Sequence, residues 1–170
     1  VLLSAACEIG ANLGAVTRGE VRRVAEFGRE LGIAFQVRDD VLDYEASEET
    51  LGKPQCADLR EGKVTLPLLL TLKRCTHNER EQVAGLLKNA SQTAMQNLGL
   101  SEEALRASDA PAVELAPILE LVERHHGVAD SMRRAEEHAE KACAAIAAFP
   151  ESSAKQSMLD LAQYSVHRDH

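Results

Sequence analysis

The stretch FQVRDDVLDYEASEETLGKPQCADLREGKVTLPLL, residues 35–69, places three acidic residues within five positions. In a helix, Asp43 lies one turn beyond both Asp39 and Asp40, so the three side chains can share one side. They follow the apolar run LGIAF and alternate with apolar residues, which predicts a position near the core. Like charges about 5 Å apart repel by roughly 3 kcal/mol at an effective dielectric constant of about 20. A divalent cation would reverse this repulsion, and carboxylate oxygens are ligands that suit Mg²⁺.

The DDxxD pattern by itself gives only weak support for a cation site, because such strings occur by chance. A solvated acidic face, partly neutralised by Arg38, explains the same residues equally well. The flanking residues favour the cation site, because polar and glycine-containing groups recur around the aspartates over more than thirty positions. These groups are Phe35-Gln36, Gly52-Lys53, Asp58-Leu59, Gly62-Lys63 and Thr65-Leu66-Pro67.

The combined string, FQxxDDxLD followed by GKxxxxDLxxGKxTLP, resembles the second aspartate-rich region of the trans-polyprenyl diphosphate synthases. The resemblance extends over essentially the whole chain through LLSAACEIGANLGA, HGVADSMRRAEEHAEKA and LDLAQYSVHRDH, although the second of these lacks the aromatic residue usual in the family. Residues 42–69 are most similar to octaprenyl- and solanesyl-type synthases. The resemblance implies that residues 1–170 form the C-terminal portion of a polyprenyl synthase domain, with the all-α isoprenoid synthase fold.

The resemblance also implies a chemistry and a set of site residues. Members of this family elongate an allylic diphosphate by Mg²⁺-dependent condensation with isopentenyl diphosphate, here giving a long-chain trans-polyprenyl diphosphate. The implied metal ligands are Asp39, Asp40 and Asp43. The implied diphosphate contacts are Lys53 and Lys63, which are also the implied catalytic residues together with Asp39 and Asp40. Gln36 and Phe35 would line the allylic site, with Phe35 excluding water from the reacting carbocation.

Several of these residues also have simpler explanations. Lys53 and Lys63, taken singly, read as solvated loop lysines, and Gln36 as an ordinary helix residue. Asp58 is expected to cap the turn before Leu59. The pair His125-His126 suggests a metal site, but adjacent residues point about 100° apart on a helix and rarely chelate together. A position at a helix end, where the dipole is negative, is the preferred interpretation of this pair.

Half of the family's active site has no counterpart in this sequence. The first aspartate-rich motif, its arginine, the Lys-Thr pair and the residues that gate product length are not found. We therefore expect a C-terminal fragment that is inactive by itself and that forms a homo-oligomer through the apolar sides of residues 1–16 and of the DDVLD helix. The alternatives are a noncatalytic or regulatory subunit of a heteromeric synthase, and a purely structural helical bundle.

The composition predicts an all-α bundle of about seven helices. Hydrophobic residues make up 45% of the chain and aromatic residues only 3%, with no Trp, so the core is aliphatic. Helices are expected at 1–16, 20–44, within 64–74, 78–90, 111–126, 128–149 and 152–168. The first is expected to be deeply buried, Asn78 and Gly127 are expected to cap the fourth and the fifth, and Gly10, Gly14, Gly28 and Gly32 are expected at close helix contacts.

Charge and cysteine content restrict the partners and the location. The formal net charge of -8 argues against nucleic-acid binding, which needs a basic surface. No apolar stretch approaches the roughly 20 residues of a membrane span. The four cysteines are too widely spaced for a zinc motif or a disulfide framework, and are expected to be reduced thiols of a cytoplasmic protein.

Overall fold

The computed structural model describes residues 1–45, 56–96 and 114–168 of the chain. Within these ranges the regular elements are helices and no strand occurs, which confirms the predicted all-α class. The chain divides into two compact units: the first comprises Val1–Leu42 and Ser131–His170, and the second comprises Asp43–Asp130. No helix in the described ranges combines the length and the apolar character that crossing a bilayer requires.

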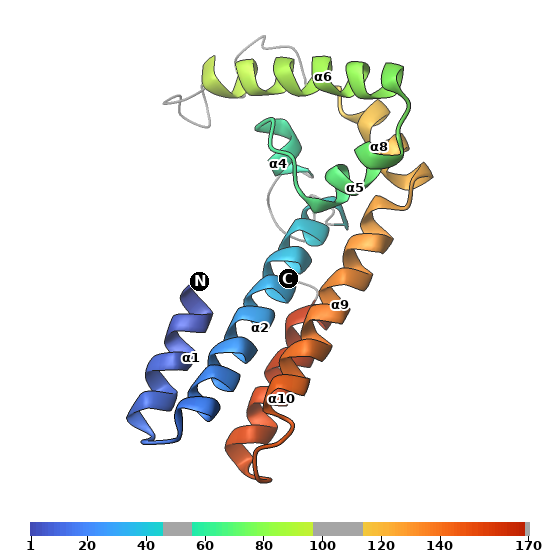
Figure 1. Ribbon diagram of the computed structural model, residues 1–170. Helices are drawn as coiled ribbons and strands as arrows, with labels where there is room; N and C mark the ends of the chain where they lie inside the picture. Colours follow the sequence, from blue (N-terminus) through green and yellow to red (C-terminus); the bar gives the residue numbers. More distant parts are fainter. Residues whose placement is uncertain (46–55, 97–113, 169–170) are drawn as a thin grey trace. The chain divides into compact units, whose positions relative to one another are not determined.

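The first unit contains α1 (Leu2–Leu13), most of α2 (Arg18–Glu45), most of α9 (Gly127–Ile146) and α10 (Ser153–His167), shown in Figure 1. Its core is mainly aliphatic, and α2, α9 and α10 each contribute apolar residues at helical spacing. The buried members are Phe27, Leu31, Ala142, Ile146 and Ala162. The predicted helices at 20–44, 128–149 and 152–168 are thus confirmed, with shifted ends.

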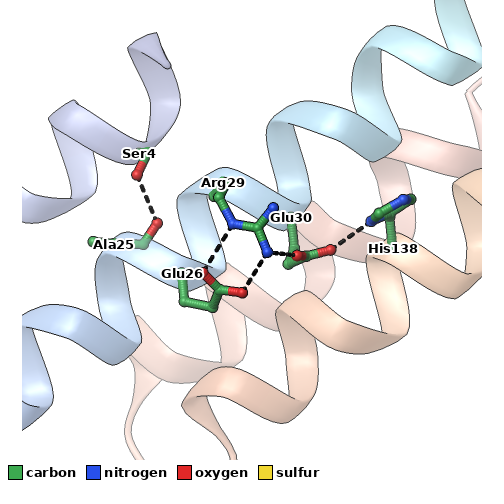
Figure 2. A network of polar contacts seen from close by, with 6 residues as sticks. All are labelled: Ser4, Ala25, Glu26, Arg29, Glu30 and His138. Carbon is green, nitrogen blue, oxygen red and sulfur yellow. Dashed lines mark hydrogen bonds and ion pairs between the residues drawn. The ribbon is translucent and has the colours of Figure 1, made fainter.

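Helix α1 lies beside α2, where Gly28 permits a close approach (Figure 1). A Cβ atom at Gly28 would lie 2.5 Å from the Leu3 carbonyl oxygen and 2.7 Å from Cys7 Sγ. Ser4 adds a hydrogen bond to the Ala25 carbonyl, at 2.9 Å (Figure 2). The predicted deep burial of residues 1–16 is wrong for this chain, since α1 has no buried residue and only one of its sides meets α2.

The prediction of close contacts at all four glycines holds only in part. Gly28 makes the contact described above, and a Cβ at Gly32 would reach the Leu3 side chain at an ordinary 3.6 Å. The prediction is wrong at Gly10, where a Cβ would have nothing within 4 Å. The side of α1 that carries Gly10 therefore faces open space within the described chain.

A polar network lies between α2 and α9 in the first unit (Figure 2). The Glu30 side chain is only 4% exposed. Its carboxylate pairs with Arg29, which also bridges to Glu26, and with His138 Nδ1 at 2.5 Å. Because an unpaired buried carboxylate is costly, these partners make the burial of Glu30 tolerable.

The second unit consists of α4 (Ala57–Arg60), α5 (Leu66–Arg74), α6 (His77–Gln96) and α8 (Ala116–Arg124). The helix predicted within 64–74 is confirmed as α5, with Thr65 at its N-cap and Pro67 in its first turn. The core of this unit gathers apolar side chains from each of these four helices and from the end of α2. Its most buried members are Leu59, Leu68 and Ile118.

Two helix ends differ from their predicted caps. Asn78 lies inside α6, and Thr76 instead exchanges hydrogen bonds with Glu79, whose Oε2 accepts from the Thr76 N–H at 2.8 Å. This is a capping box, and Thr17 with Glu20 forms a second one at the start of α2.

Gly127 is not the C-cap of α8: His125 holds that place, and Gly127 opens α9. A Cβ at Gly127 would approach the Pro67 carbonyl oxygen to 2.5 Å, so glycine is needed there for packing.

Substituting the glycines tests the packing of α1. Gly28→Ala should lower the free energy of unfolding by about 1–3 kcal/mol, because its Cβ would meet backbone atoms that cannot move aside. Gly10→Ala, the matched control, should be neutral or stabilising by up to about 1 kcal/mol, because alanine favours the helix and the space is open. Urea denaturation of both variants measures the difference, and equal effects would contradict the described contact.

The capping box of α2 should make stability depend on pH. Hydrogen bonds from the Thr17 side chain and backbone lower the pKa of Glu20 below its usual 4.5. The stability that ionised Glu20 contributes is therefore fully present above pH 4.5 and is lost as the pH falls through the lowered pKa. Denaturation across this range should show the advantage of wild type over Glu20→Ala shrinking at acid pH. The exposed control Glu136→Ala should show no such convergence.

Candidate functional site

Helix α2 carries the three predicted acidic residues without a break. Asp39 and Asp40 lie in the part of α2 that belongs to the first unit, and Asp43 opens the second unit. None of the three side chains is fully buried and none is fully exposed. The three aspartates are thus half-buried on α2.

Asp39 pairs with an arginine from the far end of the chain. Arg168, at the C-cap of α10, donates to Asp39 Oδ1, and its guanidinium lies 4.0 Å from the centroid of the Phe35 ring. The Arg168 side chain is 11% exposed, whereas that of Asp39 is 40% exposed. The carboxylate therefore keeps access to solvent while one of its oxygens holds a cationic group.

Arg168 is itself held in place by a second arginine. The guanidinium of Arg38, a residue only 7% exposed, donates to the Arg168 carbonyl oxygen through Nε at 3.1 Å and through Nη2 at 2.9 Å. A planar guanidinium that donates two bonds to one acceptor fixes that acceptor's position. Arg38 and Arg168 thus attach the end of α10 to the segment of α2 that carries Asp39.

Asp40 is contacted from its own helix. Gln36 lies one turn earlier and donates through Nε2 to Asp40 Oδ1 at 3.3 Å. Gln36 is exposed, and Phe35 is 41% exposed. Both residues also line a largely apolar groove of about 730 Å³ in the first unit. The other walls of this groove are formed by Val1, Leu2, Leu3, Arg29, Gly32, Ile33 and Val37.

Asp43 supplies the hydrogen bonds that α4 lacks at its start. Its Oδ1 accepts from the Ala57 N–H at 2.9 Å, and its Oδ2 accepts from the Asp58 N–H at 3.2 Å. Cys56 holds the N-cap position of α4 but provides no side-chain bond. Burial is the largest influence on Asp43 and raises its pKa, and the charge of Asp58 adds to this effect. A carboxylate with a raised pKa gains from any further positive charge placed beside it.

Of the two predicted lysines, only Lys63 lies among the described residues. Lys53 lies outside the described residues. Lys63 Nζ is 3.0 Å from Asp58 Oδ1 and 2.6 Å from Glu61 Oε2, and these carboxylates raise its pKa. Asp58 lies in the first turn of α4 and pairs with Lys63, so the predicted cap at Asp58 is wrong and Asp43 fills that role.

Sequence reasoning did not anticipate the contact between Arg168 and Asp39 or the bond from Asp43 to α4. Both join residues that are distant in sequence, and neither has a local pattern. The one available signal for Arg168 was its place in LDLAQYSVHRDH, the segment that resembles the family's closing sequence.

The four cysteines are free thiols, as expected.

Three comparisons bear on this site. The family model described as polyprenyl synthetase matches residues 1–101. An octaprenyl diphosphate synthase of Haemophilus influenzae is 34% identical over 169 residues, and a short chain isoprenyl diphosphate synthase of Methanothermobacter thermautotrophicus is 32% identical over 170 residues. Each alignment covers 99% of this chain and 46% of the relative.

A solved structure gives the same coverage. The polyprenyl synthase from Caulobacter crescentus CB15, complexed with calcium and isoprenyl diphosphate, is 32% identical and aligns with a TM-score of 0.73. The alignment covers 99% of this chain and 46% of that one. The chain thus spans about half the length of the curated relatives it matches.

Removing the charge of Arg168 tests how Asp39 is held. Arg168→Gln should lower the free energy of unfolding by about 1–2 kcal/mol, because it removes a charge-assisted hydrogen bond and a cation–π contact. Arg133→Gln is the matched control, since Arg133 makes an exposed pair with Glu137 at 3.1 Å. That exposed pair should contribute less than about 0.5 kcal/mol. Equal losses for the two variants in urea denaturation would contradict the described role of Arg168.

Proposed function

The chain belongs to the polyprenyl synthetase family, and on that basis we propose that it carries the metal- and diphosphate-binding half of a prenyltransferase active site. The complete enzyme would elongate an allylic diphosphate with isopentenyl diphosphate to give a long-chain trans-polyprenyl diphosphate. The all-α isoprenoid synthase fold expected from the sequence is confirmed by the solved relatives. Because the chain spans 46% of its relatives, activity is proposed for the complete enzyme and not for this chain by itself.

The observation that carries the proposal is the set of carboxylates on adjacent turns of α2. Asp39, Asp40 and Asp43 lie on one unbroken helix, and within the first unit Gln36 contacts Asp40 and lines the apolar groove together with Phe35. Carboxylates suit the metal-bound head of a prenyl diphosphate, and an apolar groove suits its hydrocarbon tail. A purely structural bundle would need neither feature at this position.

The donor set fits Mg²⁺. Each of the three side chains offers hard oxygen ligands, and Mg²⁺ is typically held by a few carboxylates together with substrate phosphates. These oxygens now accept hydrogen bonds from Arg168 at Asp39, from Gln36 at Asp40 and from two backbone amides at Asp43, and a bound cation would compete with these donors. Burial raises the pKa of Asp43, and a cation bound beside this carboxylate would favour its ionised form.

The proposed chemistry assigns a task to each residue. When bound, Mg²⁺ supplies positive charge against the leaving diphosphate. Lys53 and Lys63 would donate hydrogen bonds to the diphosphate oxygens, stabilising the negative charge that develops as the carbon–oxygen bond breaks. Lys63 would first have to leave Asp58 and Glu61, with which it now pairs. Gln36 would orient the allylic substrate by a polar contact.

Phe35 and the groove would keep water from the carbocation. The alkene of isopentenyl diphosphate then attacks that carbon, and a proton is lost to the departing diphosphate. Both α1 and α2 contribute aliphatic side chains to the groove walls, which suits a growing prenyl chain, although Arg29 and Gln36 also line it. A cytoplasmic location and a homo-oligomer remain predictions, and the exposed side chains of Leu2, Ile9 and Leu13 on α1 support self-association.

Thermal unfolding with Mg²⁺ and pyrophosphate tests the proposal. The pair should raise the Tm, and Mg²⁺ or pyrophosphate added singly should raise it less, because each completes the other's site. Asp39→Asn and Asp40→Asn should each reduce the effect of the pair by more than half, since each removes an anionic ligand.

Asp160→Asn is the matched control, because Asp160 accepts from Gln156 one turn earlier at 2.8 Å, as Asp40 does from Gln36. This variant should keep the full response. A rise in Tm that survives both Asp39→Asn and Asp40→Asn, or no rise at all in the wild type, would favour a structural bundle.

A further inference from the structure

A second group of metal-ligating side chains lies in the second unit, away from the acidic residues of α2. Cys75, Glu79 and His125 each offer one ligand atom, and these atoms all lie within 4.8 Å of one another. Cys75 follows α5, Glu79 lies in the first turn of α6, and His125 is the C-cap of α8. Three helices of one unit thus bring a thiol, a carboxylate and an imidazole together.

The imidazole of His125 provides an independent indication of a ligand. Its Nε2 is buried and has no hydrogen-bond partner among the described residues. A buried polar atom without a partner costs free energy, so such an atom calls for an explanation. The backbone of His125 is well fixed, since its N–H donates to Leu121 at 3.0 Å and its carbonyl oxygen accepts from Arg74. A metal bound at Nε2 would satisfy the ring without moving the backbone.

The other two groups are also suitably placed. Cys75 is 4% exposed, and its sulfur is one of the three ligand atoms that lie within 4.8 Å of one another. The Thr76 N–H and the Thr76 hydroxyl both donate to Glu79 Oε2, at 2.8 Å and 2.9 Å. Glu79 Oε2 serves the capping box, while Oε1 pairs with the exposed Arg124 at 3.1 Å. Arg124 is 60% exposed and can turn to solvent, which frees Oε1 for a metal.

We propose that Cys75, Glu79 and His125 bind a transition-metal ion of the Zn²⁺ class, with water as a fourth ligand. Thiolate sulfur and imidazole nitrogen select zinc-type ions over Mg²⁺ or Ca²⁺, which take oxygen ligands. On binding, a sulfur–metal bond forms and the thiol proton passes to solvent, so the step is a simple exchange of proton for metal. The site is distinct from the acidic residues of α2 and does not depend on the proposed prenyltransferase activity.

A metal in this position would join the connection between α5 and α6 to the end of α8. These segments bound the core of the second unit, to which Cys75 and Leu121 both belong. Because the metal binds the folded arrangement and not the unfolded chain, it should stabilise this unit. The role assigned to the metal is structural.

Absorption spectroscopy with Co²⁺, on the tag-free 170-residue chain under reducing conditions, tests the proposal. One equivalent of Co²⁺ should produce a thiolate-to-cobalt charge-transfer band, and Zn²⁺ should remove the band by displacement. Co²⁺ bound to the aspartates of α2 would give no such band, because the band requires a sulfur ligand. Zn²⁺ should also raise the Tm.

Variants separate this site from its neighbours. Cys75→Ser should abolish the band, and His125→Gln should weaken Co²⁺ binding by more than about tenfold, the loss typical even of a residue that only supports a ligand. His126→Asn is the matched control: His126 is the adjacent, exposed imidazole, and asparagine tolerates its positive φ of 56°. His126→Asn and Cys143→Ser should bind Co²⁺ like the wild type.

Two results would overturn the proposal. One is the absence of a charge-transfer band in the wild type. The other is a band that survives Cys75→Ser or that is weakened equally by His125→Gln and His126→Asn. If Cys75→Ser does not fold, as judged by circular dichroism, the comparison of the two histidine variants decides the question.

Discussion

Repulsion among the carboxylates at the end of α2 is the constraint on which the surrounding structure depends. Three acidic side chains within five residues repel one another, and each of them accepts hydrogen bonds from a different kind of donor. Asp39 receives a guanidinium from the end of α10, Asp40 an amide from its own helix, and Asp43 two backbone N–H groups of α4. Elements remote in sequence are thus attached to α2 through its acidic residues, and a cation that bound these residues would compete with those attachments.

Helices could be predicted well from the sequence, because periodicity and breakers are local. The helices predicted at 20–44 and 128–149 both have counterparts in the structure. The helix starts were less well predicted, although Thr17-Glu20 and Thr76-Glu79 both fit the capping-box pattern and could have been recognised from it. The predicted burial of residues 1–16 was wrong, because an apolar sequence indicates that a segment can be buried but not which other residues are present to cover it.

The sequence was sufficient to predict which residues belong to the candidate site, but not which partners their side chains contact. The spacing of Asp39, Asp40 and Asp43 was sufficient to place them on one helix, since that depends only on the helical repeat. The pairing of Asp39 with Arg168 spans most of the chain and leaves no local trace. Likewise, Cys75, Glu79 and His125 are brought together by the packing of α5, α6 and α8, and no sequence spacing connects the histidine to the other two.

Diffraction from crystals grown with Mn²⁺ and pyrophosphate would show whether the acidic residues of α2 bind a metal together with a diphosphate, because the anomalous signal of Mn²⁺ locates the metal. We expect an anomalous peak bonded to oxygens of Asp39 and its acidic neighbours on α2, with the Arg168 guanidinium moved from Asp39 Oδ1 onto the pyrophosphate or into solvent. An Asp39–Arg168 pair that persists at saturating Mn²⁺ and pyrophosphate, with no metal on the α2 carboxylates, would contradict it.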